Sequence, residues 1–577
     1  MGRAGKKAAR LAGAGIGGLT SGAERPDGDP PSLALSEFDA DAPEESYRRA
    51  VPFEHRRRWG QFFTPPAIAD LMCRWVAAKG PKTLLDPAVG PGIFLRAFRR
   101  RTDKCRLTAI DVDETALEAC RRAIGSSGPI TLLREDFLTW SSDAQFDAIL
   151  ANPPYLRHHD MLYDLDIFRE IGRRNGVRLS RLTNAYGLFL LETCRRLSPG
   201  GRASVIIPGE WLNANFGMPL KGFLLENGLL RLLVYYSHAS IVFEDALTTA
   251  CLLFIEKSPG KTAPDKLRTV FVDGDVSPGV LRPALEGKMI RDGKVIERTI
   301  AMDVLRREAK WNHLLEHGED ERLPGFVPLS ALAGSCRGIA TGANRFFHLS
   351  DEDFREHGLS PRHRRPCIGR AASVRGFIFE GKDFERLVES GQRCHLMVFA
   401  GDLSERDRSY LRMGEREGLP ERYLLAGRSP WYSMEERRPA PIWAAVFGRG
   451  QLRFIWNAAG ILNLTTFHCI YPTLERPNLT PALIACLNSD FVQELARRHH
   501  RVYGGGLRKF EPRDLLEIQV PDLAAVSENT LAELADLLTG LHVAAGRARD
   551  AEAKVHRRLN RLISAAVEEI GTVAASP

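Results

Sequence analysis

Residues 83–92 read Thr-Leu-Leu-Asp-Pro-Ala-Val-Gly-Pro-Gly, and this stretch decides the fold class. Its first four residues have the pattern of a short buried strand, and residues 93–98, which follow the glycines, have helical spacing. A strand, a glycine turn and a helix in this order let the backbone approach a nucleotide-like ligand closely. The turn has neither the three-glycine dinucleotide spacing nor a phosphate-binding lysine. It therefore favours an uncharged or cationic nucleoside group over a pyrophosphate.

Polar residues also follow the next three predicted strands. Strands 107–110, 130–133 and 146–151 lead into Asp111-Val112-Asp113, Glu135-Asp136-Phe137 and Asn152-Pro153-Pro154-Tyr155. Open α/β sheets bind ligands at the carboxyl ends of their strands, so we expect these clusters and Asp86 to share one site. Asp111 suits a pair of ribose hydroxyls, and Asp136 with Phe137 suits an adenine ring. A helix cap or a surface turn explains one such cluster, but not four in register.

The tetrapeptide Asn152-Pro153-Pro154-Tyr155 suits the binding of a flat, conjugated amino group. The exocyclic amine of adenine is a poor nucleophile because its lone pair is spread into the ring. The side-chain oxygen of Asn152 and the carbonyl of Pro153 would each accept one N–H, which frees the lone pair for attack on a methyl donor. The two prolines preset the carbonyl direction, and Tyr155 would stack on the base. The alternative is a Pro-Pro turn that closes an edge strand.

The order of these motifs resembles that of the adenine-N6 DNA methyltransferases of the gamma arrangement, the TaqI-like group, over residues 55–256. In that family a segment similar to Gly60–Pro66 closes over the cofactor, S-adenosylmethionine. The resemblance implies catalytic roles for Asn152, Pro153, Pro154 and Tyr155. It also implies that Phe243 packs on a flipped-out base. The residues that it implies for cofactor binding are Thr64, Asp86, Ala88, Gly90, Gly92, Asp111, Asp136 and Phe137.

The resemblance and the length of 577 residues predict several domains. We expect a Rossmann-like class I methyltransferase domain with a mixed, mostly parallel sheet over residues 51–260. A C-terminal α+β target-recognition domain should follow over residues 327–525. The remaining segments are expected to be a disordered tail over residues 1–50, a connector over residues 261–326 and a helical tail over residues 526–577.

The C-terminal half interleaves arginines with aromatic residues and glycines, which is typical of surfaces that contact phosphates and bases. The candidates for contacts with double-stranded DNA are Arg345, Arg428, Arg508 and Lys509. A solvated surface over core aromatics would explain any single stretch equally well. The net charge of +8 fits a polyanionic partner without requiring one.

Composition limits the other classes. The ten cysteines are scattered without a CxxC pair or the spacing of a zinc site, so we expect reduced thiols and no metal. No apolar run is long enough to span a bilayer, so we expect no membrane contact and a cytoplasmic location.

Several alternatives remain open at this point. The Asn-Pro-Pro-Tyr motif also occurs in RNA methyltransferases and in glutamine methyltransferases that act on proteins. A combined restriction and modification enzyme would need a nuclease domain, for which the chain shows no room, but a separately encoded endonuclease is compatible with the sequence. A non-catalytic DNA-binding module is the alternative of another class. The intact motifs favour an adenine-specific DNA methyltransferase of a restriction-modification or phage-defence system.

Overall fold

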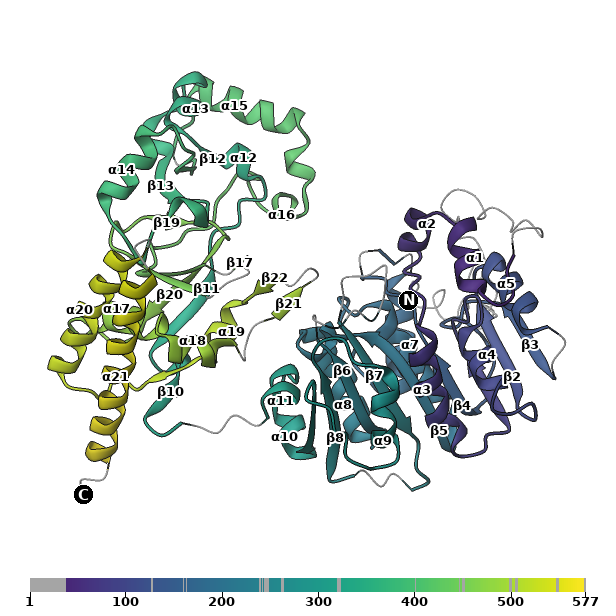
Figure 1. Ribbon diagram of the computed structural model, residues 1–577. Helices are drawn as coiled ribbons and strands as arrows, with labels where there is room; N and C mark the ends of the chain where they lie inside the picture. The colour runs from purple at the N-terminus through teal and green to yellow at the C-terminus, as the bar shows by residue number, and fades with distance from the viewer. Residues whose placement is uncertain are drawn as a thin grey trace, which may run out of the picture. The chain divides into compact units, whose positions relative to one another are not determined.

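The computed structural model divides the chain into two compact units, Met1–Trp311 (unit 1) and Asn312–Pro577 (unit 2) (Figure 1). Each unit is described by itself. The residues that the structure describes are 38–125, 128–158, 160–161, 163–237, 240, 242, 249–260, 264–318, 323–399, 401–445, 447–448, 452–497, 501–503, 507–545 and 549–574.

The described part of unit 1 contains a nine-stranded sheet in the order β3-β2-β1-β4-β5-β7-β6-β8-β9. Neighbouring strands from β3 to β5 run parallel, β7 is antiparallel to both β5 and β6, β8 is parallel to β6, and β9 is antiparallel to β8. This mixed, mostly parallel sheet confirms the expected fold class. Its strands are β1 Thr83–Asp86, β2 Arg106–Asp111, β3 Ile130–Arg134, β4 Phe146–Ala151, β5 Leu197–Pro208, β6 Leu230–Tyr236, β7 Ala250–Glu256, β8 Lys266–Val272 and β9 Val295–Ala301.

The chain order reverses between β1 and β4, so the carboxyl ends of these two strands border the crevice in which open α/β sheets bind ligands. Helices α3 and α4 share a buried apolar core with β1, β2 and β4. Helix α3 begins at Pro66, where the missing N–H needs no partner, and α5 is capped by the Asp113 side chain. The helices of unit 1 are α1 Pro43–Ala50, α2 Phe53–Arg58, α3 Pro66–Ala77, α4 Ile93–Arg99, α5 Glu114–Ile124, α6 Leu165–Asn175, α7 Ala185–Arg196, α8 Met218–Glu226, α9 Arg282–Leu285 and α10 Met302–Arg307.

Two segments of unit 1 differ from the expected domain plan. Residues 261–326, expected to be a connector, contain β8 and β9, which extend the sheet. The register of β8 depends on its parallel partner β6, which lies far away along the chain, so local composition does not reveal the pairing. Residues 43–50, expected to lie in a disordered tail, form α1, whose Tyr47 is fully buried. The rest of that expected tail up to residue 37 lies outside the described residues.

Unit 2 has an α+β architecture with several small sheets. Their strand orders are β11-β20-β16-β18-β14, β12-β15-β13-β19, β17-β22-β21 and β10-β23. The strands are β10 Phe326–Pro328, β11 Ala333–Arg337, β12 His348–Leu349, β13 Arg364–Ile368, β14 Ile378–Phe379, β15 His395–Met397, β16 Ile442–Ala445, β17 Phe447–Gly448, β18 Arg453–Asn457, β19 Leu462–Asn463, β20 Phe467–Pro472, β21 Arg501–Tyr503, β22 Leu507–Lys509 and β23 Gln519–Pro521.

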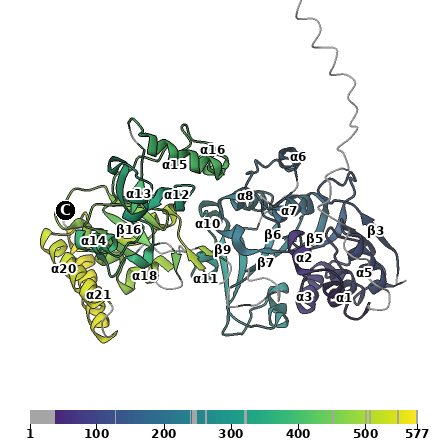
Figure 2. The same ribbon diagram turned by 90° about the horizontal axis from the view of Figure 1, so that it is seen from above.

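The helical spacing over residues 527–570 predicts one or two long helices, and the structure has two, α20 and α21, which lie side by side (Figures 1 and 2). Their leucines share a core with α17 and with strands of the largest sheet of unit 2. The helices of this unit are α11 Asn312–Glu316, α12 Asn344–Phe347, α13 Asp351–Glu356, α14 Gly381–Glu389, α15 Glu405–Arg416, α16 Tyr423–Ala426, α17 Leu479–Leu487, α18 Asp490–Ala496, α19 Pro512–Leu516, α20 Glu528–Ala544 and α21 Arg549–Ala574.

Among the described residues, no helix combines the length and the apolar character needed to cross a membrane.

Candidate active site

The loop after β1 is shaped by two glycines with left-handed backbone conformations. Gly90 has φ +52° and Gly92 has φ +93°. A Cβ at Gly92 would lie 2.8 Å from Cys120 Sγ on α5, so only glycine allows this approach, whereas a Cβ at Gly90 would meet nothing within 4 Å. The N–H of Gly90 donates to Asp111 Oδ2 at 2.8 Å, which ties the loop to the end of β2. The loop thus has one packed side, at Gly92, and one open side, at Gly90.

Two carboxylates stand beside this loop. Asp86 is fully buried, and its Oδ1 accepts from the N–H of Ala88 at 3.3 Å. Its Oδ2 is buried without a hydrogen-bond partner among the described residues. Burial raises the pKa of Asp86 well above its usual range, and burial also raises the pKa of Asp111 to about 6. A buried acceptor without a donor costs folding free energy, so the orphaned oxygen of Asp86 is suited to a ligand that supplies one.

The segment 60–64 makes three hydrogen bonds with the Asn-Pro-Pro-Tyr sequence that follows β4. The carbonyl of Gly60 accepts from the Tyr155 N–H at 2.9 Å. A Cβ at Gly60, which has φ +64°, would lie 2.7 Å from that nitrogen, so the approach requires glycine. The Asn152 side-chain nitrogen donates to the carbonyl of Phe62 at 2.6 Å and to Thr64 Oγ1 at 3.0 Å.

These two hydrogen bonds set the orientation of the Asn152 amide. A primary amide has two N–H donors and one carbonyl acceptor, and both donors are engaged by the segment 60–64. The remaining atom, Oδ1, is buried and has no partner in the described part of the chain. The side chain therefore presents a bare acceptor, with its direction held by Phe62 and Thr64. Thr64, expected to bind cofactor, is 3% exposed, and its hydroxyl accepts from the Asn152 amide.

The same segment also reaches the end of β2 through Gln61. The Gln61 side-chain nitrogen donates to Asp113 Oδ2 at 3.2 Å, and its oxygen lies 3.0 Å from the hydroxyl of Tyr47 on α1. The Tyr47 hydroxyl also bonds to Asp113 Oδ2. Asp113 meanwhile caps α5 through the N–H of Thr115. Segment 60–64 therefore links the acids after β2 with the Asn152 amide after β4.

Sequence inspection missed Tyr47, because it lies in a stretch assigned to a disordered tail. One local signal was present: Pro43 followed by Glu44 and Glu45 is typical of the start of a helix. The structure adds an ion pair between Glu44 and Arg96 of α4 at 2.7 Å, which anchors α1 beside the glycine loop.

The residues after β3 are held from two sides. Asp136 Oδ2 accepts from the Tyr163 hydroxyl at 2.8 Å, and its Oδ1 accepts from the Leu138 N–H at 2.9 Å. Burial raises the pKa of Asp136. No local pattern had pointed to Tyr163, because its contact with Asp136 depends on the path of the loop after β4.

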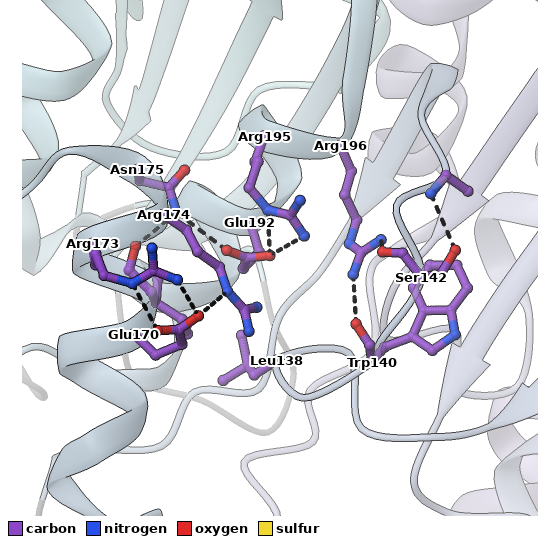
Figure 3. Close-up of polar contacts among 12 residues, drawn as sticks. Leu138, Trp140, Ser142, Glu170, Arg173, Arg174, Asn175, Glu192, Arg195 and Arg196 are labelled. Carbon is purple, nitrogen blue, oxygen red and sulfur yellow. Dashed lines mark hydrogen bonds and ion pairs between the residues drawn. The ribbon is translucent and has the colours of Figure 1, made fainter. Parts of the chain in front are cut away.

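Phe137 departs from the expectation that its ring packs on an adenine. It is 1% exposed and lies 5.3 Å from the ring of Phe189 and 5.5 Å from the guanidinium of Arg196. Arg196 is itself buried and donates to the carbonyls of Trp140 at 2.8 Å and Ser142 at 2.5 Å (Figure 3). The Phe137 ring is thus part of the core, and its packing there supports the loop after β3.

Tyr155 is held close to Asn152. Its ring lies 5.3 Å from that of Phe62, and its hydroxyl is 3.5 Å from the Ile206 carbonyl of β5. Pro153 is buried and Pro154 is half-buried. The structure therefore brings together the four residues of the motif, Asp86, Ala88 and the glycine loop, Asp111, and segment 60–64. Phe243, the residue expected to pack on a flipped base, lies outside the described residues.

The four candidates for DNA contacts in unit 2 differ in their surroundings. Arg345 is exposed beside a cavity. Arg428 instead donates to the carbonyls of Ala340, Thr341 and Ser433 at 2.6–3.2 Å, so it supports the backbone and its expected role in DNA contact is not supported. Arg508 and Lys509 belong to β22, and their side chains lie outside what the structure describes. Within the described ranges, no group of three or more His, Cys, Asp or Glu side chains could hold a metal ion.

A mostly parallel sheet, a glycine loop after β1, acids after β2 and β3, and Asn-Pro-Pro-Tyr after β4 together define a Rossmann-like class I methyltransferase domain. Comparison with known proteins gives the family. Residues 105–243 match the family "Eco57I restriction-modification methylase", and residues 314–550 match "Type II methyltransferase M.Eco57I, C-terminal domain".

Two curated relatives are similar over most of their length. Type II methyltransferase M.AccI of Acinetobacter calcoaceticus is 33% identical over 498 residues, which cover 86% of this chain and 91% of that protein. Type II methyltransferase M.XamI of Xanthomonas campestris pv. amaranthicola is 26% identical over 485 residues, which cover 82% and 87%. The chain belongs to the gamma-class Type II DNA methyltransferases of restriction-modification systems.

A solved structure shows the same fold at low sequence identity. A nuclease-deletion mutant of the Type ISP restriction-modification enzyme LlaGI, solved in complex with a DNA substrate mimic, superimposes with a TM-score of 0.50 at 12% identity. The match covers 86% of this chain and 57% of that chain.

Proposed function

We propose that this DNA methyltransferase transfers a methyl group from S-adenosylmethionine to N6 of an adenine that is flipped out of a specific sequence in duplex DNA. The observation that carries the proposal is the Asn152 amide. Both of its N–H groups are engaged by Phe62 and Thr64, and its Oδ1 is a buried acceptor without a partner in the described part of the chain. A primary aromatic amine supplies the donor that this oxygen lacks.

The chemistry follows from the fixed acceptor. Asn152 Oδ1 and the Pro153 carbonyl would each accept one N–H of the target amine, which draws the nitrogen toward tetrahedral geometry and localises its lone pair. Because the amide cannot rotate without losing two hydrogen bonds, the acceptor needs no reorganisation as charge develops. The proton leaves after methyl transfer, when the alkylated nitrogen has become acidic. No general base is required before attack.

The residues beside the glycine loop fit the cofactor. When bound, S-adenosylmethionine supplies an electrophilic methyl group on a sulfonium centre. Asp86 and the loop with Gly90 and Gly92 would hold its amino-acid part, because the loop is open at Gly90 and Asp86 Oδ2 lacks a donor within the described residues. Asp111 would accept from the ribose hydroxyls, and Asp136 from the adenine amine.

Base flipping has a cost that the site must offset. Removal of a base from the stack costs a few kcal/mol. The ring of Tyr155, positioned by Phe62 and by the Gly60 carbonyl, would restore part of the lost stacking. A separately encoded endonuclease of the same sequence specificity would complete such a Type II system.

Sequencing that detects modified bases tests the proposal on plasmid DNA from cells that express the chain, beside an Asn152→Ala control. We expect N6-methyladenine at one short recurring motif, and loss of the mark in the control. A cytosine mark would overturn the adenine assignment. If the purified chain binds S-adenosylmethionine but leaves DNA unmethylated, the substrate would instead be RNA or protein.

A further inference from the structure

Unit 2 contains a cavity that the methyl-transfer chemistry does not explain. Its volume is about 620 Å³, and its lining includes Arg337, Asn344, Arg345 and Arg422. A smaller hollow of about 180 Å³ lies beside it and is lined by Asn344, Arg345, Arg370 and Arg393, among others. Asn344 and Arg345 line both hollows, so these two residues lie between them.

Asn344 and Arg345 begin α12, and the loop that precedes this helix is fixed by contacts with neighbouring residues. The guanidinium of Arg428 donates to the carbonyls of Ala340 and Thr341. Gly342 has φ +78°, and a Cβ there would lie 2.9 Å from the Leu425 side chain of α16, so the loop can approach α16 only with glycine at this position. Phe346, directly after the pair, stacks on Tyr410 with ring centroids 4.4 Å apart. The backbone at Asn344 and Arg345 is therefore fixed both before the pair, by the contacts of residues 340–342, and after it, by the packing of Phe346.

The pair presents hydrogen-bond donors. Thr341 Oγ1 donates to Asn344 Oδ1, which orients the amide so that its oxygen faces Thr341 and its two N–H donors point away from Thr341. Both side chains are exposed, and Arg345 forms no ion pair with any described residue. A guanidinium adds five donors in a planar fork.

The charge around the two hollows is strongly positive. Arg337 and Arg422 line the larger one, Arg370 and Arg393 line the smaller one, and Glu417 is the one acid that lines either of them among the described residues. Arg337 and Arg393 have acidic partners at 3.6 Å and 3.5 Å, Glu435 and Asp353. Arg370 and Arg422, like Arg345, have no ion-pair partner in the described part of unit 2.

This surface fits one nucleic-acid feature. In the major groove of B-DNA, base edges lie between two phosphate backbones, and guanine presents two acceptors, N7 and O6. We propose that Asn344 and Arg345 contact base edges in the major groove, with Arg345 bonded to a guanine, while the arginines around the two hollows contact the flanking phosphates. The proposal rests on the assignment of duplex DNA as substrate, and it assigns the specificity contact to the first residues of α12, directly after the loop that Arg428 supports.

Methylation rates of the full chain on short duplexes test the proposal. The duplexes carry the target motif found by sequencing, each single-base substitution of it, and 7-deazaguanine in place of each guanine. We expect 7-deazaguanine at one position to slow the wild-type chain roughly 5- to 100-fold, the range of one bidentate base contact. Arg345→Ala should slow methylation of the unmodified motif similarly and become insensitive to 7-deazaguanine at that position.

Arg345→Lys keeps the charge without the planar fork, so discrimination at that position should weaken while non-specific DNA binding is retained. The matched control is Arg375→Ala, an exposed arginine of the same unit that lines neither hollow.

Three results would overturn the assignment. They are a target motif without guanine, unchanged discrimination in Arg345→Ala, and a uniform loss over all duplexes with a shallower salt dependence, which would indicate a phosphate contact. If the methylated base is not adenine, the proposed chemistry fails, but the comparison among duplexes still tests Arg345.

Discussion

The candidate active site of unit 1 buries polar groups that bond to one another, whereas the cavity of unit 2 displays cations to solvent. In unit 1, Phe62 and Thr64 hold the Asn152 side chain, and Gln61 and Tyr47 bond to Asp113. The atoms of this site without a partner among the described residues are two buried oxygens, Asn152 Oδ1 and Asp86 Oδ2. In unit 2, Arg345 in the first turn of α12 and Arg422 directly before α16 line a cavity.

The difference reflects what each surface has to do. Chemistry on one amine requires an acceptor whose direction does not change during the reaction, and buried hydrogen bonds provide that stability. DNA recognition requires long cationic side chains that reach a solvated polyanion, so these must remain exposed before binding. Unit 1 should therefore respond to substitution mainly through kcat, and unit 2 mainly through affinity and sequence preference.

The same substitution at two asparagines gives the largest contrast. Asn152→Asp replaces both N–H donors with a carboxylate that faces the Phe62 carbonyl and the Thr64 hydroxyl, so the acceptor loses its orientation. We expect kcat to fall about 10³-fold, as when a positioned polar group is removed from a reacting centre. Asn344→Asp should raise KM for DNA and leave kcat within about threefold. Single-turnover rates and DNA titrations measure both, and comparable effects on kcat would break the contrast.

Two arginines of unit 2 allow the support of the backbone to be tested separately from the recognition of DNA. Arg428→Ala leaves three carbonyls without their cationic donor, and we expect unit 2 to lose about 2–4 kcal/mol of folding free energy. Arg345→Ala removes an exposed side chain and should change stability by less than about 0.5 kcal/mol. Thermal unfolding, together with hydrogen exchange of residues 338–346, measures the difference. Equal stability of the two variants would show that Arg428 does not brace the loop.

The sequence predicted the parts of the site that are local to a strand. Strands β1 to β4 were recognisable from apolar runs. Asp86 and Asp111 end β1 and β2, Asn152 follows β4 directly and Asp136 lies two residues after β3, so their placement required only the rule that ligands bind at the carboxyl ends of strands. The two long C-terminal helices were predictable for a similar reason, because their leucine spacing lies within each helix.

The features that were missed depend on contacts between distant residues. The hydrogen bonds from Gln61 and Tyr47 to Asp113 span 52 and 66 positions, and those from Arg428 to its loop span 87 and 88. Strand β8 pairs in parallel with β6, so its place in the sheet required the whole topology. An arginine beside an aromatic looks the same in sequence whether it bonds to backbone, as Arg428 does, or faces solvent, as Arg345 does.

Thr64 tests how far the active-site network acts on chemistry rather than on cofactor binding. Thr64→Val keeps the shape and removes the hydroxyl that accepts from Asn152, so one N–H loses its partner. We expect kcat to fall roughly 10- to 30-fold, about the cost of one buried unsatisfied donor, with unchanged affinity for S-adenosylmethionine. Thr64→Ser should restore the rate. A weaker cofactor affinity at normal kcat would instead favour the cofactor role that the family resemblance implies.

The smallest predicted effect is a pH dependence that originates at Asp111. Burial raises the pKa of Asp111 from 3.8 to about 6. If the ionised carboxylate accepts from the ribose hydroxyls, affinity for S-adenosylmethionine should fall below pH 6 and be roughly tenfold weaker at pH 5.

The contribution of Asp111 to the free energy of unfolding should change with pH in the opposite sense to the affinity for S-adenosylmethionine. Between pH 3.8 and about 6 the folded chain retains a proton that the unfolded chain has lost. The stabilisation that Asp111 gives to the folded state is therefore fully present below pH 3.8 and is lost as the pH rises through about 6. Asp111→Asn should remove the part of each dependence that Asp111 contributes and leave the parts that come from the buried Asp86 and Asp136, whose pKa values are also raised. Calorimetric titration and thermal unfolding from pH 5 to 8 would measure the difference. A cofactor affinity that stays constant over this range in the unmodified chain would exclude Asp111 as the ribose acceptor, whereas Asn152 would keep its role, because its amide does not titrate.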